Sequence, residues 1–288
     1  MVYDRGITLQ IGNVNSIVRI DKRHGLIGAG AAVIALIVCC IWYSWKAGIA
    51  FAALFLMAGF IRVQPKNVFV CVLLNALWGM LCIFVSCALP NVMISDSSFV
   101  SIGRYRIVMN VLCVAVIYGI CLVATGKIKY AVGTASFLLL LMTTADAFVF
   151  QFRGSELKIS DFLSIKTALN VAGQYTYRIQ DGMMYSWLLW LWMMLCLHAL
   201  PTPDGVMGKC WLRVLGAMAT CACALLVIFN TPDVRTNTWS NGGTTQNGYF
   251  LNFYSGLRDC FIEKPEGYSP KTVEELAGGV ELTPQSLV

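Results

Sequence analysis

Long apolar runs separated by short polar breaks dominate the chain up to residue 230. A transmembrane helix needs about 20 predominantly apolar residues, and seven stretches approach or reach that length. They lie at about 25–45, 48–63, 67–89, 105–125, 130–151, 183–200 and 211–230. The pattern predicts an all-α polytopic membrane protein with about seven transmembrane helices.

The breaks between these runs differ in strength. Pro90 ends the third run, because proline interrupts helical hydrogen bonding, whereas only Lys46-Ala47-Gly48 separates the first run from the second. The second run is also short for a span. If residues 25–63 instead form one long helix or a re-entrant hairpin, the number of spans falls to six or five.

Between the fifth and sixth runs, residues 152–181 are polar with an apolar stripe. Ser160 or Asp161 is a natural N-cap, and Gly173 suits the position that ends a helix. Apolar residues recur between them at helical spacing, namely Phe162, Ile165, Leu169 and Ala172. We therefore expect an amphipathic helix near 161–173 that lies at the outer membrane surface.

Polar segments flank the apolar region on both sides. The first run starts too late and is too long for a cleavable signal peptide. After the last run come a polar loop at 231–247, an apolar and aromatic stretch at 248–262 that suits a surface helix, and a short helix beginning at Ser269-Pro270. These changes predict a cytoplasmic segment at 1–24, a transmembrane domain at 25–230 and an extracellular juxtamembrane linker at 231–288.

The composition supports membrane insertion. Hydrophobic residues make up 58% of the chain and charged residues only 12%, against roughly 25% charged in soluble domains. The net charge of +6 is dispersed beside the apolar runs. That distribution is typical of topology signals and lipid-headgroup contacts rather than of nucleic-acid binding.

The basic residues also predict an orientation. With the N-terminus inside, the short inner segments hold most of the lysines and arginines close to helix ends: Arg19, Lys22, Arg23, Arg62, Lys66, Lys127, Lys129, Lys209 and Arg213. Cytoplasmic loops carry such an excess. We therefore expect a multi-pass cell-membrane protein with its N-terminus inside and its C-terminal tail extracellular.

Three polar residues lie within predicted spans. Asp146 is an acid in the fifth run, and such residues are functional candidates by default because burying them in a bilayer is costly. The alternative is that Asp146 pairs with an arginine near the outer membrane surface to hold helices together, with Arg153, Arg104 and Arg106 as the options. Asn75 and Asn110 suit interhelical hydrogen bonds.

The outer segment also offers a site for an anionic headgroup. The planar guanidinium of Arg153 matches phosphate oxygens, and Asp161 anchors the expected amphipathic helix beside it. The alternative is that these long charged side chains only extend their charged ends into the bilayer interface and bind no headgroup.

Recognisable catalytic or metal-binding patterns are missing from the sequence. It contains no nucleophile elbow, P-loop or HExxH motif, and its twelve cysteines show no zinc spacing. His24 and His198 are isolated from each other in the sequence. We therefore predict no catalytic residue, no metal ligand and no cofactor within this chain.

Two passages resemble a known family. FRGSELKISDFLSIKTALNVAGQY, at 152–175, is similar to the outer segment of the lipoteichoic-acid-synthase-like phosphoglycerol transferases of Gram-positive bacteria. NGYFLNFYSGLRDCFIEKPEGYSPKTVEEL, at 247–276, is similar to the juxtamembrane linker of the same family. The resemblance covers about fifty residues of the N-terminal membrane part and linker.

The resemblance implies an activity that this chain does not carry alone. The family transfers glycerol phosphate from phosphatidylglycerol to a polymer used in the cell wall, with a threonine nucleophile and a divalent metal, usually manganese. Both belong to an extracellular domain of the sulfatase superfamily, and the sequence ends at Val288, about where that domain is expected to begin. The chain would then anchor a catalytic sulfatase-like domain, in cis or in trans, and present lipid to it.

Within this hypothesis, the residues expected to bind the lipid headgroup are Asp146, Arg153, Asp161, Lys166, Asn170 and Tyr175. Two other functions stay open at this point. Seven spans with intramembrane polar residues are compatible with a lipid or small-solute transporter. A non-catalytic membrane partner of a cell-envelope enzyme is the third candidate.

Overall fold

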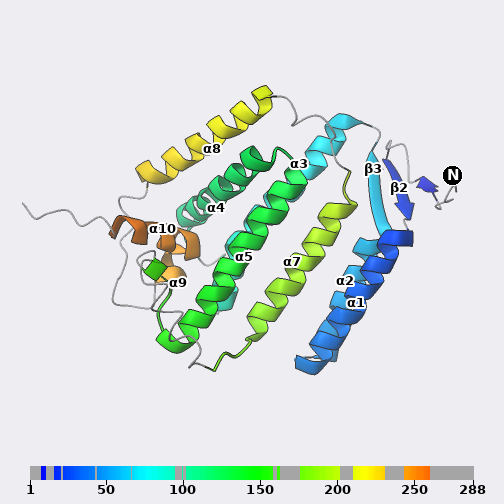
Figure 1. The fold of residues 1–288 in the computed structure, drawn as a ribbon, viewed down its shortest axis with the longest axis horizontal. Coiled ribbons are helices and arrows are strands. Elements are labelled where there is room, and N and C mark those ends of the chain that lie inside the picture. The colour runs from blue at the N-terminus through cyan, green and yellow to red at the C-terminus, as the bar shows by residue number, and fades with distance from the viewer. Residues whose placement is uncertain are drawn as a thin grey trace, which may run out of the picture.

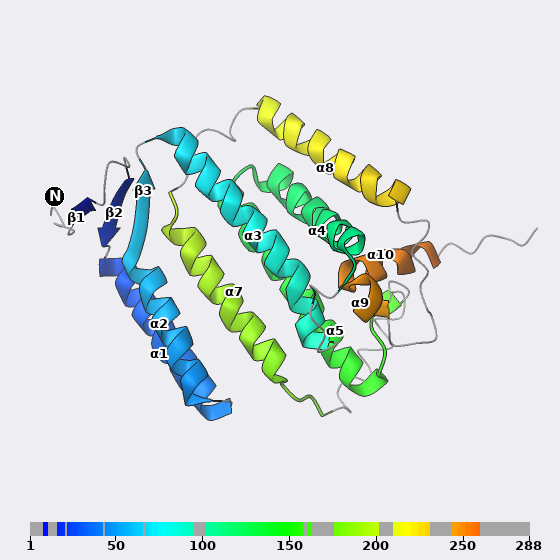
Figure 2. The same ribbon diagram turned by 180° about the vertical axis from the view of Figure 1, so that it is seen from behind.

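The computed structural model describes residues 8–10, 16–20, 22–42, 44–65, 67–94, 99, 102–157, 161–162, 176–201, 210–230 and 243–259. Seven helices run alongside one another and alternate in direction (Figures 1 and 2). They are α1 (Lys22–Trp42), α2 (Trp45–Phe60), α3 (Val68–Ile94), α4 (Arg104–Thr125), α5 (Ile128–Arg153), α7 (Asp181–Ala199) and α8 (Cys210–Asn230).

Six of these helices, all except α2, are long and apolar enough to cross a membrane. This confirms the predicted class, a polytopic helical membrane protein. Each of the seven predicted runs corresponds to one helix, but α2 has only 16 residues. Seven crossings therefore stay a prediction, as does the orientation.

The bundle has two distinct ends. Strands β1 (Thr8–Gln10), β2 (Ser16–Ile20) and β3 (Ile61–Pro65) form a small antiparallel sheet in that order. The sheet marks what we call the sheet end (Figure 1). At the opposite end, which we call the tail end, the short helices α9 (Gly243–Asn247) and α10 (Tyr249–Asp259) lie beside α4 and α5.

The sheet is a small addition to the helical fold that the sequence did not predict. Residues 61–63 were expected to complete the second span, but α2 ends at Phe60 and the chain continues as β3. Ser16–Ile20 is rich in β-branched residues, and in Ile61–Pro65 such residues alternate with others, which favours strands. Antiparallel pairing of β2 with β3 satisfies backbone groups that an isolated segment would leave unpaired.

The first two helices form a tight hairpin. Ser44 caps α2 by accepting a hydrogen bond from the Lys46 N–H, so the alternative of one long helix over 25–63 is wrong. The backbones touch at two glycines: a Cβ on Gly28 would lie 2.6 Å from the Cα of Gly59. Only residues without a side chain allow this approach.

Helix α3 does not stop at Pro90, contrary to the sequence prediction, and continues to Ile94. A proline removes one helical hydrogen bond, but neighbouring helices can compensate within a membrane. Here Met93 and Ile94 are buried in the main hydrophobic cluster. Packing therefore outweighs the local preference and holds the last turn in place.

Helix α7 connects two hydrophobic clusters. The larger cluster joins α3, α4, α5, α7 and α10, and the smaller one joins α1, α2 and α7. Three tryptophans of α7 also donate side-chain hydrogen bonds: Trp187 to Thr144, Trp190 to Ser136 and Trp192 to the Leu54 carbonyl. By contrast, α8 packs against α4 and presents most of its surface outward.

Candidate functional site

The candidate site lies at the tail end, where α9 and α10 dock on the ends of α4 and α5. We call it the tail-docking site and define it by the polar side chains that meet there. They are Asn110, Asp146, Glu156, Thr244, Asn247, Tyr249 and Asn252.

Asp146 is fully buried, with an exposed fraction of 0%. Its Oδ1 accepts a hydrogen bond of 2.7 Å from the backbone N–H of Leu157. The chain reaches back to Asp146 because α5 ends at Gly154, whose φ of 67° is left-handed and suits glycine. The carboxylate thus fixes the first residues of the outer segment to the bundle.

Tyr249 of α10 covers the other side of this carboxylate. Its hydroxyl interacts with Asp146, although neither this hydroxyl nor Asp146 Oδ2 makes a hydrogen bond of standard geometry. Burial, reinforced by the charge of Asp146, raises the pKa of Tyr249 well above its usual value. The phenol therefore stays protonated and acts as a donor toward the acid.

Glu156 is the second acid of the site. Its Oε2 accepts a hydrogen bond of 2.7 Å from the side-chain amide of Asn252. Thr244 interacts with the same carboxylate, although its hydroxyl makes no hydrogen bond of standard geometry. Burial nevertheless raises the pKa of Glu156, because it disfavours the charged form more than these hydrogen bonds favour it. One carboxylate thus binds both α9 and α10.

Asn110 joins α4 to the same two helices. Its amide nitrogen donates 2.7 Å hydrogen bonds to the carbonyls of Arg106 and Asn247, and its Oδ1 accepts one of 3.0 Å from the Leu251 N–H. Gly248 lies against the Asn110 side chain with a φ of 80°. Both the backbone conformation and the close contact require glycine at this position.

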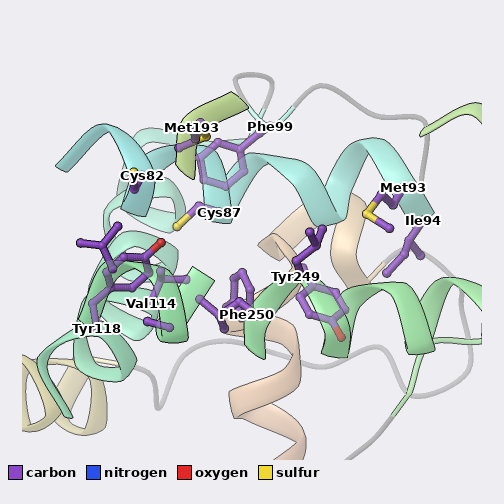
Figure 3. Packing of buried hydrophobic residues seen from close by; sticks show 14 of the residues in the cluster. Cys82, Cys87, Met93, Ile94, Phe99, Val114, Tyr118, Met193, Tyr249 and Phe250 are labelled. Carbon is purple, nitrogen blue, oxygen red and sulfur yellow. The ribbon is translucent and has the colours of Figure 1, made fainter. Parts of the chain in front are cut away.

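Aromatic side chains complete the docking. Phe250 enters the main hydrophobic cluster, and Figure 3 shows it with Tyr249 among residues of α3 and α4, such as Cys87 and Val114. Phe253 stacks on Tyr249 at 6.4 Å and meets the ring edge of Phe162 at 6.2 Å. The tail is therefore held by both polar and apolar contacts.

The structure brings together only some of the residues predicted to bind a headgroup. Arg153 and Asp161 form an ion pair of 2.6 Å, with side chains 39% and 29% exposed. Asp161 and Phe162 lie in a short 3₁₀ turn. The rest of the predicted helix at 161–173 lies outside the described residues, as do Lys166, Asn170 and Tyr175.

In the described part of the chain, two of the arginines suggested as partners of Asp146 bind other groups. Arg153 pairs with Asp161, and Arg106 donates to the carbonyl of Gln246. The interhelical role predicted for Asn75 is confirmed, because its amide bonds to the Pro201 carbonyl after α7. Asn110 also joins segments, but its partners belong to the tail.

Five residues of the site were missed in the sequence: Glu156, Thr244, Asn247, Tyr249 and Asn252. Residues 243–247 were assigned to a polar loop but form α9, whereas the helix expected within 248–262 is confirmed as α10. Asn247-Gly248 is a typical turn signal and marks the boundary between the two helices. No local pattern indicated which bundle residues the tail would meet.

The chemistry of the site is that of a structural junction. Among the described residues, no three histidine, cysteine or acidic side chains lie together as metal ligands. These residues do not fit the divalent metal that the family resemblance implies, and no reaction step follows from it here. Buried acids and amides instead join distant segments.

Comparisons of the chain with protein-family models, with curated proteins and with solved structures gave no match. The resemblance to phosphoglycerol transferases stays a prediction that rests on the two sequence passages.

Proposed function

We propose that this chain is the membrane-anchoring and lipid-presenting module of a glycerol-phosphate polymer synthase of the lipoteichoic-acid type. The observation that carries the proposal is the contact between the two passages that resemble this family. Glu156 and Phe162 of the first passage meet Asn252 and Phe253 of the second. Two segments that resemble parts of one enzyme family thus form one junction.

The junction suits an anchoring role. Because Asn110 and Glu156 hold α9 and α10 against the bundle, α10 has a defined place at the tail end, from which the chain continues. A sulfatase-like catalytic domain, in cis or in trans, would be held near the membrane by the chain after α10. Tethering raises the effective concentration of a lipid substrate for such a domain.

Lipid presentation is the second part of the proposal. Arg153 lies in the last turn of α5, beside the junction, and its pairing with Asp161 is partly exposed. Exposed ion pairs contribute little stability, so a phosphate can compete for the guanidinium. Phosphatidylglycerol at the outer leaflet is the expected lipid, and Lys166, Asn170 and Tyr175 belong to the same hypothesis.

A cellular experiment tests the anchoring role. In cells that carry this gene, the chromosomal copy is replaced by Asn252→Ala, with Asn230→Ala as the control. The Asn230 side chain is exposed and donates a hydrogen bond to the Leu226 carbonyl within α8. We expect Asn252→Ala to lower the amount of glycerol-phosphate polymer at unchanged protein level, and the control to leave it unchanged. Normal polymer after complete deletion of the gene would contradict the proposal.

A binding experiment tests lipid presentation. Purified protein in nanodiscs is compared for retention of phosphatidylglycerol and phosphatidylcholine, with Arg153→Ala against Arg178→Ala. Arg178 lies in the same outer region, where its backbone groups bond to Gln151. We expect only Arg153→Ala to lower phosphatidylglycerol retention. Solute flux in proteoliposomes that Asp146→Asn abolishes would instead favour a transporter.

A further inference from the structure

A small cavity lies inside the bundle, between α3, α5 and α7 and next to side chains of the larger hydrophobic cluster. It shares no residue with the tail-docking site and has a volume of about 10 Å³. Most of its lining is apolar, but three hydroxyl side chains belong to it: Ser86, Ser136 and Thr143. Their exposed fractions are 9%, 4% and 1%, so the cavity is a polar point within an apolar core.

Two of these hydroxyls, both on α5, act as hydrogen-bond acceptors toward their surroundings. Ser136 donates its proton to the Val132 carbonyl at 2.6 Å, and Thr143 donates to the Leu139 carbonyl at 2.8 Å. A hydroxyl has one proton and two lone pairs, so the protons of both residues are used within α5. Ser136 accepts one bond from the Trp190 indole, whereas the lone pairs of Thr143 have no donor among the described residues.

Ser86 of α3 supplies a donor. Its hydroxyl lies 2.9 Å from that of Tyr118, which interacts with Ser136 as well. A phenol is more acidic than an alcohol and is therefore the stronger hydrogen-bond donor, so Tyr118 donates in its bond with Ser86. The proton of the Ser86 hydroxyl is then available to a molecule in the cavity.

Pro90 adds an acceptor beside these hydroxyls. It lines the cavity and lies inside α3, where a residue with an N–H would donate to the carbonyl of Ser86, four positions earlier. Proline has no N–H, so this helical hydrogen bond cannot form. In membrane helices, ordered water is one of the groups that satisfy a carbonyl freed in this way.

The cavity meets both requirements for a buried water molecule. Water needs a volume of about 10–15 Å³ and two to four polar partners, and the hydroxyls with the Ser86 carbonyl supply that number. Apolar cavities stay dry because they offer no such partners. A larger ligand does not fit the volume.

We propose that this cavity is a binding site for one water molecule that joins α3 to α5 beside Pro90. The water accepts a hydrogen bond from Ser86 and donates to Thr143 and to either Ser136 or the Ser86 carbonyl. It adds a polar connection to the apolar contacts of the two helices. The site is independent of the proposed function, because it contains none of the residues of the tail-docking site.

A direct test is a crystal structure grown from a lipid phase, at a resolution that shows ordered water, for the native chain and for Thr143→Val. Valine keeps the shape of threonine and removes its hydroxyl. We expect a density peak about 3 Å from the oxygens of Ser86 and Thr143 in the native chain and its loss in the variant. A native cavity without this density, or density that Thr143→Val leaves unchanged, would overturn the proposal.

Thermal unfolding in detergent gives an independent test. The matched control is Thr134→Val, because Thr134 is exposed on the same helix and donates to the Tyr130 carbonyl at 2.7 Å. Both variants lose a hydrogen bond to the preceding turn, so their difference reports on the cavity. We expect Thr143→Val to lower the melting temperature by about 2–4 °C more than the control; an equal or smaller effect would overturn the proposal, since a dry cavity loses nothing further.

A double-mutant cycle completes the test. Ser86 and Thr143 bind the same water, so Ser86→Ala and Thr143→Val together should cost less than the sum of their separate effects. Thr134→Val combined with Ser86→Ala serves as the control and should be additive. Additive effects of Ser86→Ala and Thr143→Val would show that no water connects them and would overturn the proposal.

Discussion

At the scale of single residues, buried polar side chains join segments that are distant in the sequence. Asn75 bonds to the carbonyl of Pro201, and Asn110 bonds to that of Asn247, which is 137 positions away. An unpaired amide inside a low-dielectric bundle is costly, so the sequence could predict that both amides need partners. It could not identify the tail as the partner of Asn110, because nothing local encodes so distant a contact.

Gly248 offers a direct test of tail docking. Its left-handed φ and its contact with Asn110 predict that Gly248→Ala destabilises the docked α9–α10 pair by about 1–2 kcal/mol from the backbone alone. Limited proteolysis in detergent should then cut within 243–259 faster. Gly256→Ala is the control, because a Cβ there meets no atom within 4 Å, and a faster cut in the control alone would refute this account.

Glu156 makes tail docking sensitive to pH. Since burial raises its pKa in the docked state, the docked state binds more protons than the undocked one between the two pKa values. Docking is therefore most favourable below the ordinary pKa of 4.5 and weakens as the pH rises above it. Proteolytic protection of the tail should fall over this range in the native chain and change less in Glu156→Gln; identical profiles would exclude Glu156 as the titrating group.

At the scale of elements, the long helices and α10 were predictable, whereas α9 and the sheet were not. Continuous apolar runs indicate spans almost regardless of their surroundings. Inside the bilayer no water is present to hydrogen-bond the backbone, so such a run must form a helix. The end of α3 depends instead on the packing of Met93 and Ile94 beyond Pro90. Strand β3 likewise depends on pairing with β2, some forty positions earlier. Without knowledge of that partner, its residues read in the sequence as the end of the second helix.

The α1–α2 hairpin depends on the contact between two glycines. Replacing Gly59 by leucine forces a side chain against Gly28, and overpacking of this kind costs about 1–3 kcal/mol. We expect Gly59→Leu to lower the melting temperature in detergent. Gly30→Leu is the matched control, because a Cβ at Gly30 meets nothing within 4 Å; equal effects of the two variants would show that the contact is unimportant.

At the scale of the whole molecule, the two ends of the bundle differ in structure, with the sheet at one end and α9 and α10 at the other. Two of the basic residues that were predicted to share one face, Arg62 and Lys129, both act electrostatically on His198, whereas the orientation of the bundle stays a prediction. The predicted headgroup site is only partly visible, since Arg153 and Asp161 meet while the remaining residues lie outside the described part. The junction of the tail with the bundle was not foreseen, because it depends on tertiary contacts.

Seven crossings predict opposite locations for the two termini. Small reporter domains fused to Met1 and to Val288 should be accessible from opposite faces of sealed membrane vesicles, with the N-terminal reporter inside the cell. A third reporter at Lys127, between α4 and α5, should share the side of the N-terminus. Termini on the same side would show that one of the helices after α2 does not cross.

The small sheet limits how the chain can enter the bilayer. Strand β2 precedes α1 and β3 follows α2, yet Ser16 to Ile20 pair with Pro65 to Ile61. A bilayer cannot separate paired strands, so the polypeptide must be back in its starting compartment by residue 65, however deep α2 reaches. The sheet is consequently completed by insertion: during biosynthesis β1 and β2 emerge first and can pair with each other, and β2 gains its second partner only when the hairpin has returned β3 to it.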